Sequence, residues 1–139
     1  WSAKLGGCPL AFVHKTRDTT RPNVAVANRV VGDVAGKQCV MVDDMIDTAG
    51  TISEAVKVVM NAGASSVIVA ATHGILSDPA AQRLSECGAQ EVIVTDTLPI
   101  ALEKRFDKLT ILPIAPLLAR AIREVFDDGS VTSLFDGVA

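Results

Sequence analysis

The chain contains 139 residues, of which 49% are hydrophobic and 21% are charged, so it has enough apolar material for one domain with a single core. The formal net charge of −3 offers no basic field, and we therefore expect no nucleic-acid partner. Three scattered cysteines without Cys-x-x-Cys spacing argue against a disulfide framework or a structural zinc site. Because every apolar run is short and interrupted, we expect no segment to span a bilayer, and we expect a soluble, cytoplasmic protein.

The first third of the chain predicts strands on either side of a polar loop. Apolar residues at 10–14 indicate one strand, and residues 24–31 indicate another, whose imperfect alternation suits a hairpin arm or a sheet edge. The stretch 15–23 between them is too polar for either strand and predicts a mobile loop. Residues 39–42 form a short apolar run, which is typical of a parallel strand buried on both faces.

The remainder of the chain alternates helices with strands. Apolar residues at helical spacing from Ile52 to Met60 predict a helix, and Asn61-Ala62-Gly63 predicts its end. There follow, in order, a strand at 67–71, a helix at 79–87, strands at 91–95 and 109–112, and a helix at 114–125. This alternation predicts an α/β fold, in which a mostly parallel, twisted sheet has helices on both faces.

The junction between the 39–42 strand and the next helix carries the strongest functional signal. Three aspartates follow the strand, and a run of small residues follows them: Asp43, Asp44, Asp47, then Thr48, Ala49, Gly50 and Thr51. Successive backbone N–H groups at a helix start, with little side chain in the way, suit a phosphate. Carboxylates beside them can accept hydrogen bonds from vicinal sugar hydroxyls and can hold Mg²⁺. We interpret the run as a site for a ribose 5-phosphate unit.

A simpler interpretation is an acidic turn in which Asp47 or Thr48 caps the helix. The closely spaced aspartates would repel one another unless a cation or a donor-rich ligand offset them, which favours the ligand site. In that site, we expect Gly50 to leave room for the phosphate or to adopt a positive φ. Neither Gly-x-x-x-x-Gly-Lys nor Gly-x-Gly-x-x-Gly is present, so the turn is not a Walker loop or a dinucleotide fingerprint.

The run 40–52 resembles the phosphoribosyl diphosphate binding motif of the type I phosphoribosyltransferase fold. Its Asp-Thr-Ala-Gly-Thr version is similar to that of the ribose-phosphate diphosphokinases, also called phosphoribosyl pyrophosphate synthetases. Three further segments resemble the same family: its catalytic loop at 14–23, the end of its next strand at 72–77, and its C-terminal signature at 130–135. The resemblance therefore covers nearly the whole chain.

This resemblance implies a fold, a reaction and a larger protein. Residues 1–139 would form the C-terminal phosphoribosyltransferase-like domain, without the first strand and helix of that domain and without the N-terminal domain. The whole enzyme would transfer the diphosphoryl group of ATP to ribose 5-phosphate with Mg²⁺, and it would be a homo-oligomer. We expect the fragment alone to be inactive. A sheet without its first strand should expose an edge or an apolar face, unless the missing half or a neighbouring subunit fills it.

The resemblance also implies a role for individual residues. Lys15 and Arg17 would be catalytic, because diphosphoryl transfer relies on cationic groups placed where charge develops in the transition state. Asp43 and Asp44 would face the ribose hydroxyls, and Asp47 would lie at the mouth of the phosphate turn. The 5-phosphate itself would be bound by Thr48, Ala49, Gly50 and Thr51. No metal ligand is assigned.

Two segments leave alternatives open. Ser130 and Thr132 match a regulatory phosphate or ADP site of the family, although Ser133 replaces a tyrosine of the family pattern. The alternative is that the apolar residues of 130–135 only pin the C-terminus to the core. His73, at a strand end, can equally be a structural hydrogen-bonding residue or a ligand contact.

Two other functions compete with diphosphoryl transfer. A phosphoribosyltransferase that consumes phosphoribosyl diphosphate would need a segment that recognises a nucleobase, and no clear segment of that kind is present. A non-catalytic, synthetase-associated regulatory subunit would resemble the synthetase but would have a degraded phosphate turn and catalytic loop. Here both motifs are intact, which favours the enzyme.

Overall fold

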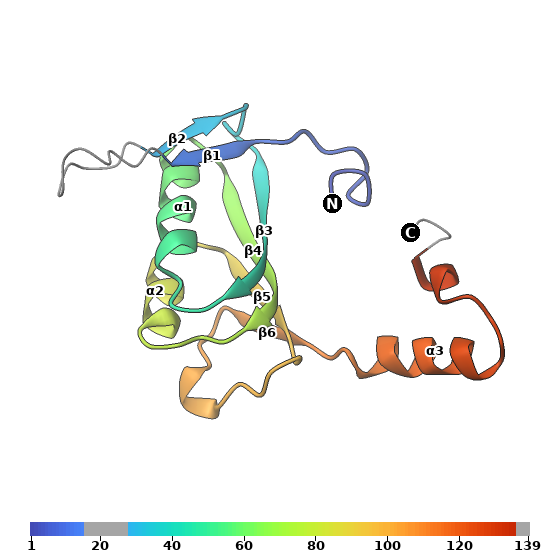
Figure 1. Ribbon diagram of the computed structural model, residues 1–139. Helices are drawn as coiled ribbons and strands as arrows, with labels where there is room; N and C mark the ends of the chain where they lie inside the picture. The colour runs from blue at the N-terminus through green and yellow to red at the C-terminus, as the bar shows by residue number, and fades with distance from the viewer. Residues whose placement is uncertain (16–27, 136–139) are drawn as a thin grey trace, which may run out of the picture.

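The computed structural model describes residues 1–15 and 28–135 of the chain (Figure 1). The strands of the described part are β1 (Phe12–Lys15), β2 (Asn28–Val31), β3 (Gln38–Ile46), β4 (Ser66–Gly74), β5 (Glu91–Thr95) and β6 (Leu109–Leu112). Its α-helices are α1 (Gly50–Asn61), α2 (Ala80–Glu86) and α3 (Ala115–Phe126), and its 3₁₀ helices are η1 (Leu102–Lys104) and η2 (Val131–Phe135).

A parallel sheet with strand order β3-β4-β5-β6 forms the body of the protein. β1 and β2 form a separate antiparallel pair, in which Phe12 lies opposite Val31. α1 and α2 lie together on one face of the sheet (Figure 1). The predicted α/β fold, the parallel sheet and the hairpin arm are therefore confirmed in the described part of the chain.

The hydrophobic core lies between the sheet and these two helices. Alternate residues of β4 and β5 are fully buried, and they form one cluster with the buried side of α1 and with α2. The largest fully buried side chains of the cluster are Leu76, Leu84, Val56, Val67, Val69, Val92 and Val94. Burying each such side chain stabilises the fold by about 1.5–3 kcal/mol.

The opposite face of the sheet is open, whereas the sequence pattern predicts helices on both faces. Val40 and Val42 of β3 keep 43% and 39% of their surface exposed. α3 extends away from the sheet and packs mainly against η2 (Figure 1). As a result, Ile122 is 70% exposed and Phe126 is 86% exposed. An amphipathic pattern shows that a helix has an apolar face, but it does not identify the surface that covers it, which is why this prediction was wrong for the described residues.

β3 is longer than predicted and includes the first two aspartates. Its pairing with β4 continues from Asp43 opposite Ala71 to Met45 opposite His73 and Ile46 opposite Gly74. The prediction ended this strand at Val42 because the apolar run stops there. At an open face, however, these side chains can stay in solvent while the backbone keeps its hydrogen bonds to β4.

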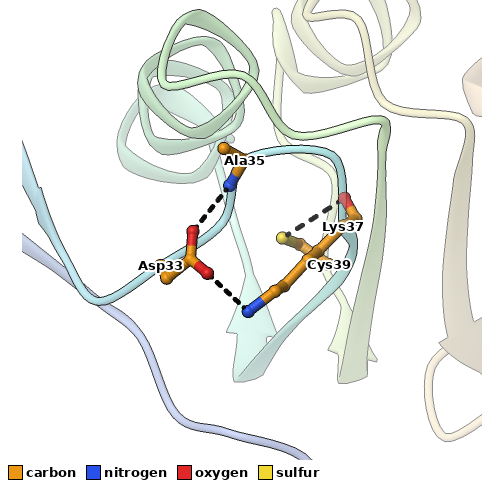
Figure 2. Close-up of polar contacts among 4 residues, drawn as sticks. All are labelled: Asp33, Ala35, Lys37 and Cys39. Carbon is orange, nitrogen blue, oxygen red and sulfur yellow. Dashed lines mark hydrogen bonds and ion pairs between the residues drawn. The ribbon is translucent and has the colours of Figure 1, made fainter.

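Asp33 fixes the turn that leads into β3. Figure 2 shows its carboxylate accepting hydrogen bonds from the Ala35 N–H at 3.3 Å and from Nζ of Lys37 at 2.8 Å. The hydrogen bond and the positive charge of Lys37 hold the pKa of the Asp33 carboxyl below its ordinary value. Cys39 follows in β3, where burial raises the pKa of its thiol. In the described ranges, no helix has the length and hydrophobicity needed to cross a bilayer.

Candidate functional site

The turn from β3 into α1 has the backbone geometry of an anion-binding site. Ala49 is the N-cap residue of α1 and adopts a left-handed conformation with φ 58°, while Gly50 begins the right-handed helix. A left-handed residue next to a right-handed one turns successive N–H groups toward a common concavity. No side chain caps this helix, so the simpler interpretation of the run, a cap by Asp47 or Thr48, is wrong. The amides of the first turn are thus available to an anion.

Gly50 differs from the prediction in its backbone conformation. Its φ lies outside the left-handed region, and the left-handed residue is Ala49. Because α1 begins at Gly50 itself, the change of chain direction falls one residue earlier. A Cβ atom at Gly50 would lie 3.5 Å from Nη1 of Arg83 and 4.0 Å from Oγ1 of Thr48, which are ordinary contact distances.

Ser53 anchors the first turn of α1 from the buried side. Its backbone N–H donates to the carbonyl of Ala49 at 3.0 Å, and its Oγ donates to the carbonyl of Gly50 at 3.1 Å. Ser53 is 4% exposed. These bonds hold the carbonyl groups toward the helix, which leaves the amide side of the turn open. No sequence pattern indicated this role.

Asp43 and Asp44 are oriented by the backbone of their own strand. Oδ1 of Asp43 accepts a hydrogen bond from the Asp44 N–H at 2.9 Å, and Oδ1 of Asp44 accepts one from the Met45 N–H at 2.8 Å. Within the described residues the second oxygen of each carboxylate has no protein partner. Both residues line a concavity of about 560 Å³ on the open face, together with Trp1, Ala70, Thr72, Ile93, Thr95 and Leu112 among others.

The positions of the carboxylates decide whether Mg²⁺ fits the site. In residues 1–15 and 28–135 no three His, Cys, Asp or Glu side chains lie close enough together to hold a metal ion. Mg²⁺ is commonly held by one or two carboxylates together with phosphate oxygens and water. Asp43 and Asp44 therefore fit Mg²⁺ as partners of a bound phosphate ester, and they do not form a cage by themselves.

Arg83 of α2 contacts the turn, although α2 begins more than thirty positions after the turn. Its Nη1 donates a hydrogen bond to the backbone carbonyl of Thr48 at 2.9 Å, across a sequence separation of 35 residues. Arg83 lies in α2, and its side chain is exposed. Sequence reasoning missed this residue, because an arginine in an amphipathic helix is ordinarily a surface charge. Only the packing of α2 beside α1 brings it to the turn.

His73 takes part in a hydroxyl network at the carboxyl ends of β4 and β5. Its Nδ1 lies 2.9 Å from Oγ1 of Thr97. Oγ1 of Thr95 donates to the carbonyl of Thr72 at 2.7 Å, and Thr97 also contacts that carbonyl at 3.2 Å. Of the two predicted roles for His73, the structure supplies the partners for the structural one.

The predicted catalytic pair lies apart from the turn or outside the described residues. Lys15 ends β1 opposite Asn28, and Arg17 falls outside the described residues. The β1–β2 pair lies near the end of α1 opposite to the turn (Figure 1). Val13, Val30 and Val59 line one concavity there. The described residues therefore do not bring Lys15 together with Asp43 or Ala49, and the catalytic roles remain predictions.

The predicted regulatory residues also lie apart from the turn. Ser130 and Thr132 are exposed, and their hydroxyl oxygens form a hydrogen bond with each other. They lie after α3, in the segment that packs against that helix, away from the sheet (Figure 1). The alternative for this segment, that its apolar residues pin the C-terminus to the core, is not seen in the described part: Val131 and Phe135 are 38% and 47% exposed.

Known proteins resemble the chain along almost its full length. The model of the phosphoribosyl synthetase-associated domain family matches residues 12–136. A ribose-phosphate pyrophosphokinase of Bifidobacterium longum is 71% identical over 136 residues, which are 98% of this chain and 40% of that protein. One of Mycobacterium tuberculosis is 68% identical over 139 residues, which are 100% of this chain and 43% of that protein.

The fold matches a solved structure as well. The crystal structure of phosphoribosylpyrophosphate synthetase from Mycobacterium smegmatis superimposes with a TM-score of 0.82 at 62% sequence identity, over 93% of this chain and 40% of that one. The chain thus spans about two fifths of the length of the relatives that it matches. Because the family model matches residues 12–136, the chain belongs to the phosphoribosyl synthetase-associated domain family.

Proposed function

We propose that this chain is the C-terminal, ribose 5-phosphate-binding domain of a ribose-phosphate diphosphokinase. The whole enzyme would transfer the diphosphoryl group of ATP to ribose 5-phosphate and produce 5-phosphoribosyl 1-diphosphate. The names of the close relatives support this reaction, at 71% and 68% identity. The chain covers about two fifths of each relative, and the adenine-binding residues of the enzyme would lie in the part that it does not cover.

The observation that carries the proposal is the uncapped turn at Ala49. Its left-handed conformation, followed by the start of α1, presents backbone amides at the positive end of a helix dipole. Such a group of donors recognises a phosphate by its charge and shape, without the need for a basic side chain. The 5-phosphate of the substrate would bind here, with the hydroxyl groups of Thr48 and Thr51 as additional donors.

Asp43 and Asp44 would select the sugar. The oxygen that each carboxylate leaves free of backbone hydrogen bonds can accept a hydrogen bond from a ribose hydroxyl. The same oxygens would hold Mg²⁺ together with phosphate oxygens of the substrates. When bound, the ion would neutralise the negative charge of the diphosphoryl group. Asp47, which is exposed at the mouth of the turn, would complete the acidic rim.

Lys15 and Arg17 would supply the cationic groups for the transition state. This assignment rests on the resemblance of their segment to the catalytic loop of the family. Diphosphoryl transfer spreads charge over bridging and equatorial oxygens, so positioned cations lower its barrier more than they strengthen substrate binding. Ser130 and Thr132 would belong to a regulatory anion site formed with a neighbouring subunit of a homo-oligomer.

The direct test is a calorimetric titration of the folded 139-residue chain with three ligands: ribose 5-phosphate, inorganic phosphate and ribose. We expect ribose 5-phosphate to bind more tightly than phosphate, and ribose alone to produce no measurable heat. Asp107 is an exposed residue that follows β5, and Asp107→Asn is a matched control that should leave all three titrations unchanged. A chain that is folded by circular dichroism but binds neither phosphate ligand would contradict the proposal.

A second assay separates the enzyme from its alternatives. The complete polypeptide that contains this sequence should form AMP from ATP only when ribose 5-phosphate and Mg²⁺ are present, and the 139-residue chain alone should not. A phosphoribosyltransferase would instead release diphosphate from phosphoribosyl diphosphate when a nucleobase is added. A regulatory subunit would form no AMP in the complete polypeptide under any of these conditions.

A further inference from the structure

We propose that Arg83 is a positioning residue, which holds the Thr48–Ala49 peptide in the orientation that points the Ala49 amide at the bound phosphate. This inference rests on the proposed phosphate-binding function of the turn. It starts from one contact, the hydrogen bond of 2.9 Å from Nη1 of Arg83 to the Thr48 carbonyl. None of the sequence motifs includes Arg83.

The geometry of the peptide unit turns this contact into control of the amide side. A trans peptide is planar, so its N–H points in the direction opposite to its C=O. When Arg83 draws the Thr48 carbonyl toward α2, the Ala49 N–H must point away from α2. The same bond supports the left-handed conformation of Ala49, which is unfavourable for an alanine and has no side-chain cap to offset it.

Gly50 supplies an independent observation. A Cβ atom at this position would point at Nη1 of Arg83, at 3.5 Å. Its φ lies outside the left-handed region, so backbone strain does not explain why glycine stands here. A Cβ atom at this ordinary contact distance would fit beside the guanidinium, but the larger side chain of valine would meet it. We therefore expect the size of the side chain at 50 to control the contact of Arg83 with the Thr48 carbonyl.

The surroundings of Arg83 favour this role over an ion pair. Within residues 1–15 and 28–135, no carboxylate forms a salt bridge with Arg83, whereas Lys37 and Lys57 are both paired. Its bond to a neutral carbonyl is a single charge-assisted hydrogen bond. The same hydrogen bond joins α2 directly to the turn that precedes α1.

The first test measures the turn without any ligand. In the folded chain, Arg83→Ala should shift the backbone NMR signals of Ala49 and Gly50 and speed the hydrogen exchange of their amides. Arg83→Lys should restore most of the parental signals, because one donor at this position is sufficient. Arg120→Ala, on the distant helix α3, removes an equal charge and should change neither amide. Parental signals in Arg83→Ala would overturn the inference, whether or not the turn binds phosphate.

The second test measures the affinity of the same variants for ribose 5-phosphate and inorganic phosphate. Arg83→Ala should weaken both by about 10-fold, the effect of losing one charge-assisted hydrogen bond, and Arg83→Lys should recover most of the affinity. The ratio of parental to variant affinity should stay constant as the KCl concentration rises. If the ratio instead falls toward one, Arg83 attracts the phosphate directly as a screened charge, and the positioning role is wrong.

A double-mutant cycle tests this effect of position 50 on Arg83. In the parent, Gly50→Val should weaken phosphate binding because it displaces Arg83, and in Arg83→Ala the same substitution should cost much less. An equal loss in both backgrounds would mean that the introduced valine side chain obstructs the phosphate itself, and the effect on Arg83 would be refuted. If the parent binds no phosphate while the NMR effects appear, the proposed function fails and the positioning of the turn stands.

Discussion

The Oδ1 atom of Asp43 accepts a hydrogen bond from the backbone N–H of Asp44 at 2.9 Å, so one half of this carboxylate is committed to its own strand. Its other oxygen has no protein partner among the described residues, and Asp43 is one of the residues that line the concavity beside the sheet. The substitution Asp43→Asn keeps one acceptor oxygen for the backbone hydrogen bond. It replaces the second carboxylate oxygen with an NH₂ donor, where a ribose hydroxyl needs an acceptor. Backbone geometry and sugar recognition can therefore be separated at this residue.

We expect Asp43→Asn to weaken the binding of ribose 5-phosphate by about 10- to 100-fold, the range for a lost hydrogen bond to a charged group. Binding of inorganic phosphate should stay close to the parental value, because the turn amides are untouched. Titrating the variant with both ligands checks the prediction, with Asp107→Asn as the control for charge. An equal loss for both ligands would show that Asp43 acts on the turn instead of the sugar.

The proposed catalytic pair predicts an effect on rate. In the complete, active polypeptide, Lys15→Ala and Arg17→Ala should each lower kcat by about 100-fold or more and change the KM for ribose 5-phosphate by much less, since their contacts would form with charge that develops in the transition state. Steady-state assays of AMP formation measure both constants. A raised KM with an unchanged kcat would assign the pair to ground-state binding.

Local patterns predicted most of the fold. The order of strands and helices, the parallel sheet and the start of α1 follow from periodicity and turn residues, which act within a few positions. The length of β3 could not be predicted, because its pairing beyond Asp43 depends on the matching length of β4. The open face and the outward course of α3 depend on which surfaces meet, and a hydrophobic pattern does not encode the partner.

The candidate site was predictable in its residues but less so in its geometry. The spacing from Asp43 to Thr51 identified the turn, because phosphate binding needs small residues at a helix start. Of the two reasons expected for a glycine at 50, the positive φ was wrong: the left-handed residue is Ala49, although glycine is the usual choice for that conformation. Arg83 was out of reach, because a contact across 35 residues arises only from tertiary packing.

The position of the left-handed residue predicts which of two neighbours tolerates a β-branched side chain. Ala49→Val should lower the free energy of unfolding by about 2 kcal/mol or more, because Val is strained at φ 58° and the site is buried. Gly50→Val should lower it by less than about 1 kcal/mol, since φ there is ordinary. Urea unfolding of both variants provides the comparison. The reverse order would mean that the turn has a different conformation in solution.

The Asp33–Lys37 pair predicts a stability change on the acid side. The folded pKa of Asp33 lies below its unfolded value, so its contribution is present above the ordinary value of 3.8 and is lost as the pH falls through the lower, folded pKa. NMR titration should show this lowered pKa in the parent and a value nearer 3.8 in Lys37→Met. Lys57 on α1, whose pKa is raised by its hydrogen bond to Glu54, is a reference group that Lys37→Met should leave unchanged.

The two apolar environments of the protein predict opposite responses to substitution. Leu84 of α2 is 0% exposed, and Leu84→Ala should lower the free energy of unfolding by about 2–5 kcal/mol, through lost burial and a residual cavity. Ile122 of α3 is 70% exposed, so Ile122→Ser should change stability by less than about 0.5 kcal/mol. Urea unfolding followed by circular dichroism measures both effects. A loss of more than about 2 kcal/mol in Ile122→Ser would mean that the α3 stripe is covered in solution, because only a buried isoleucine makes such a contribution.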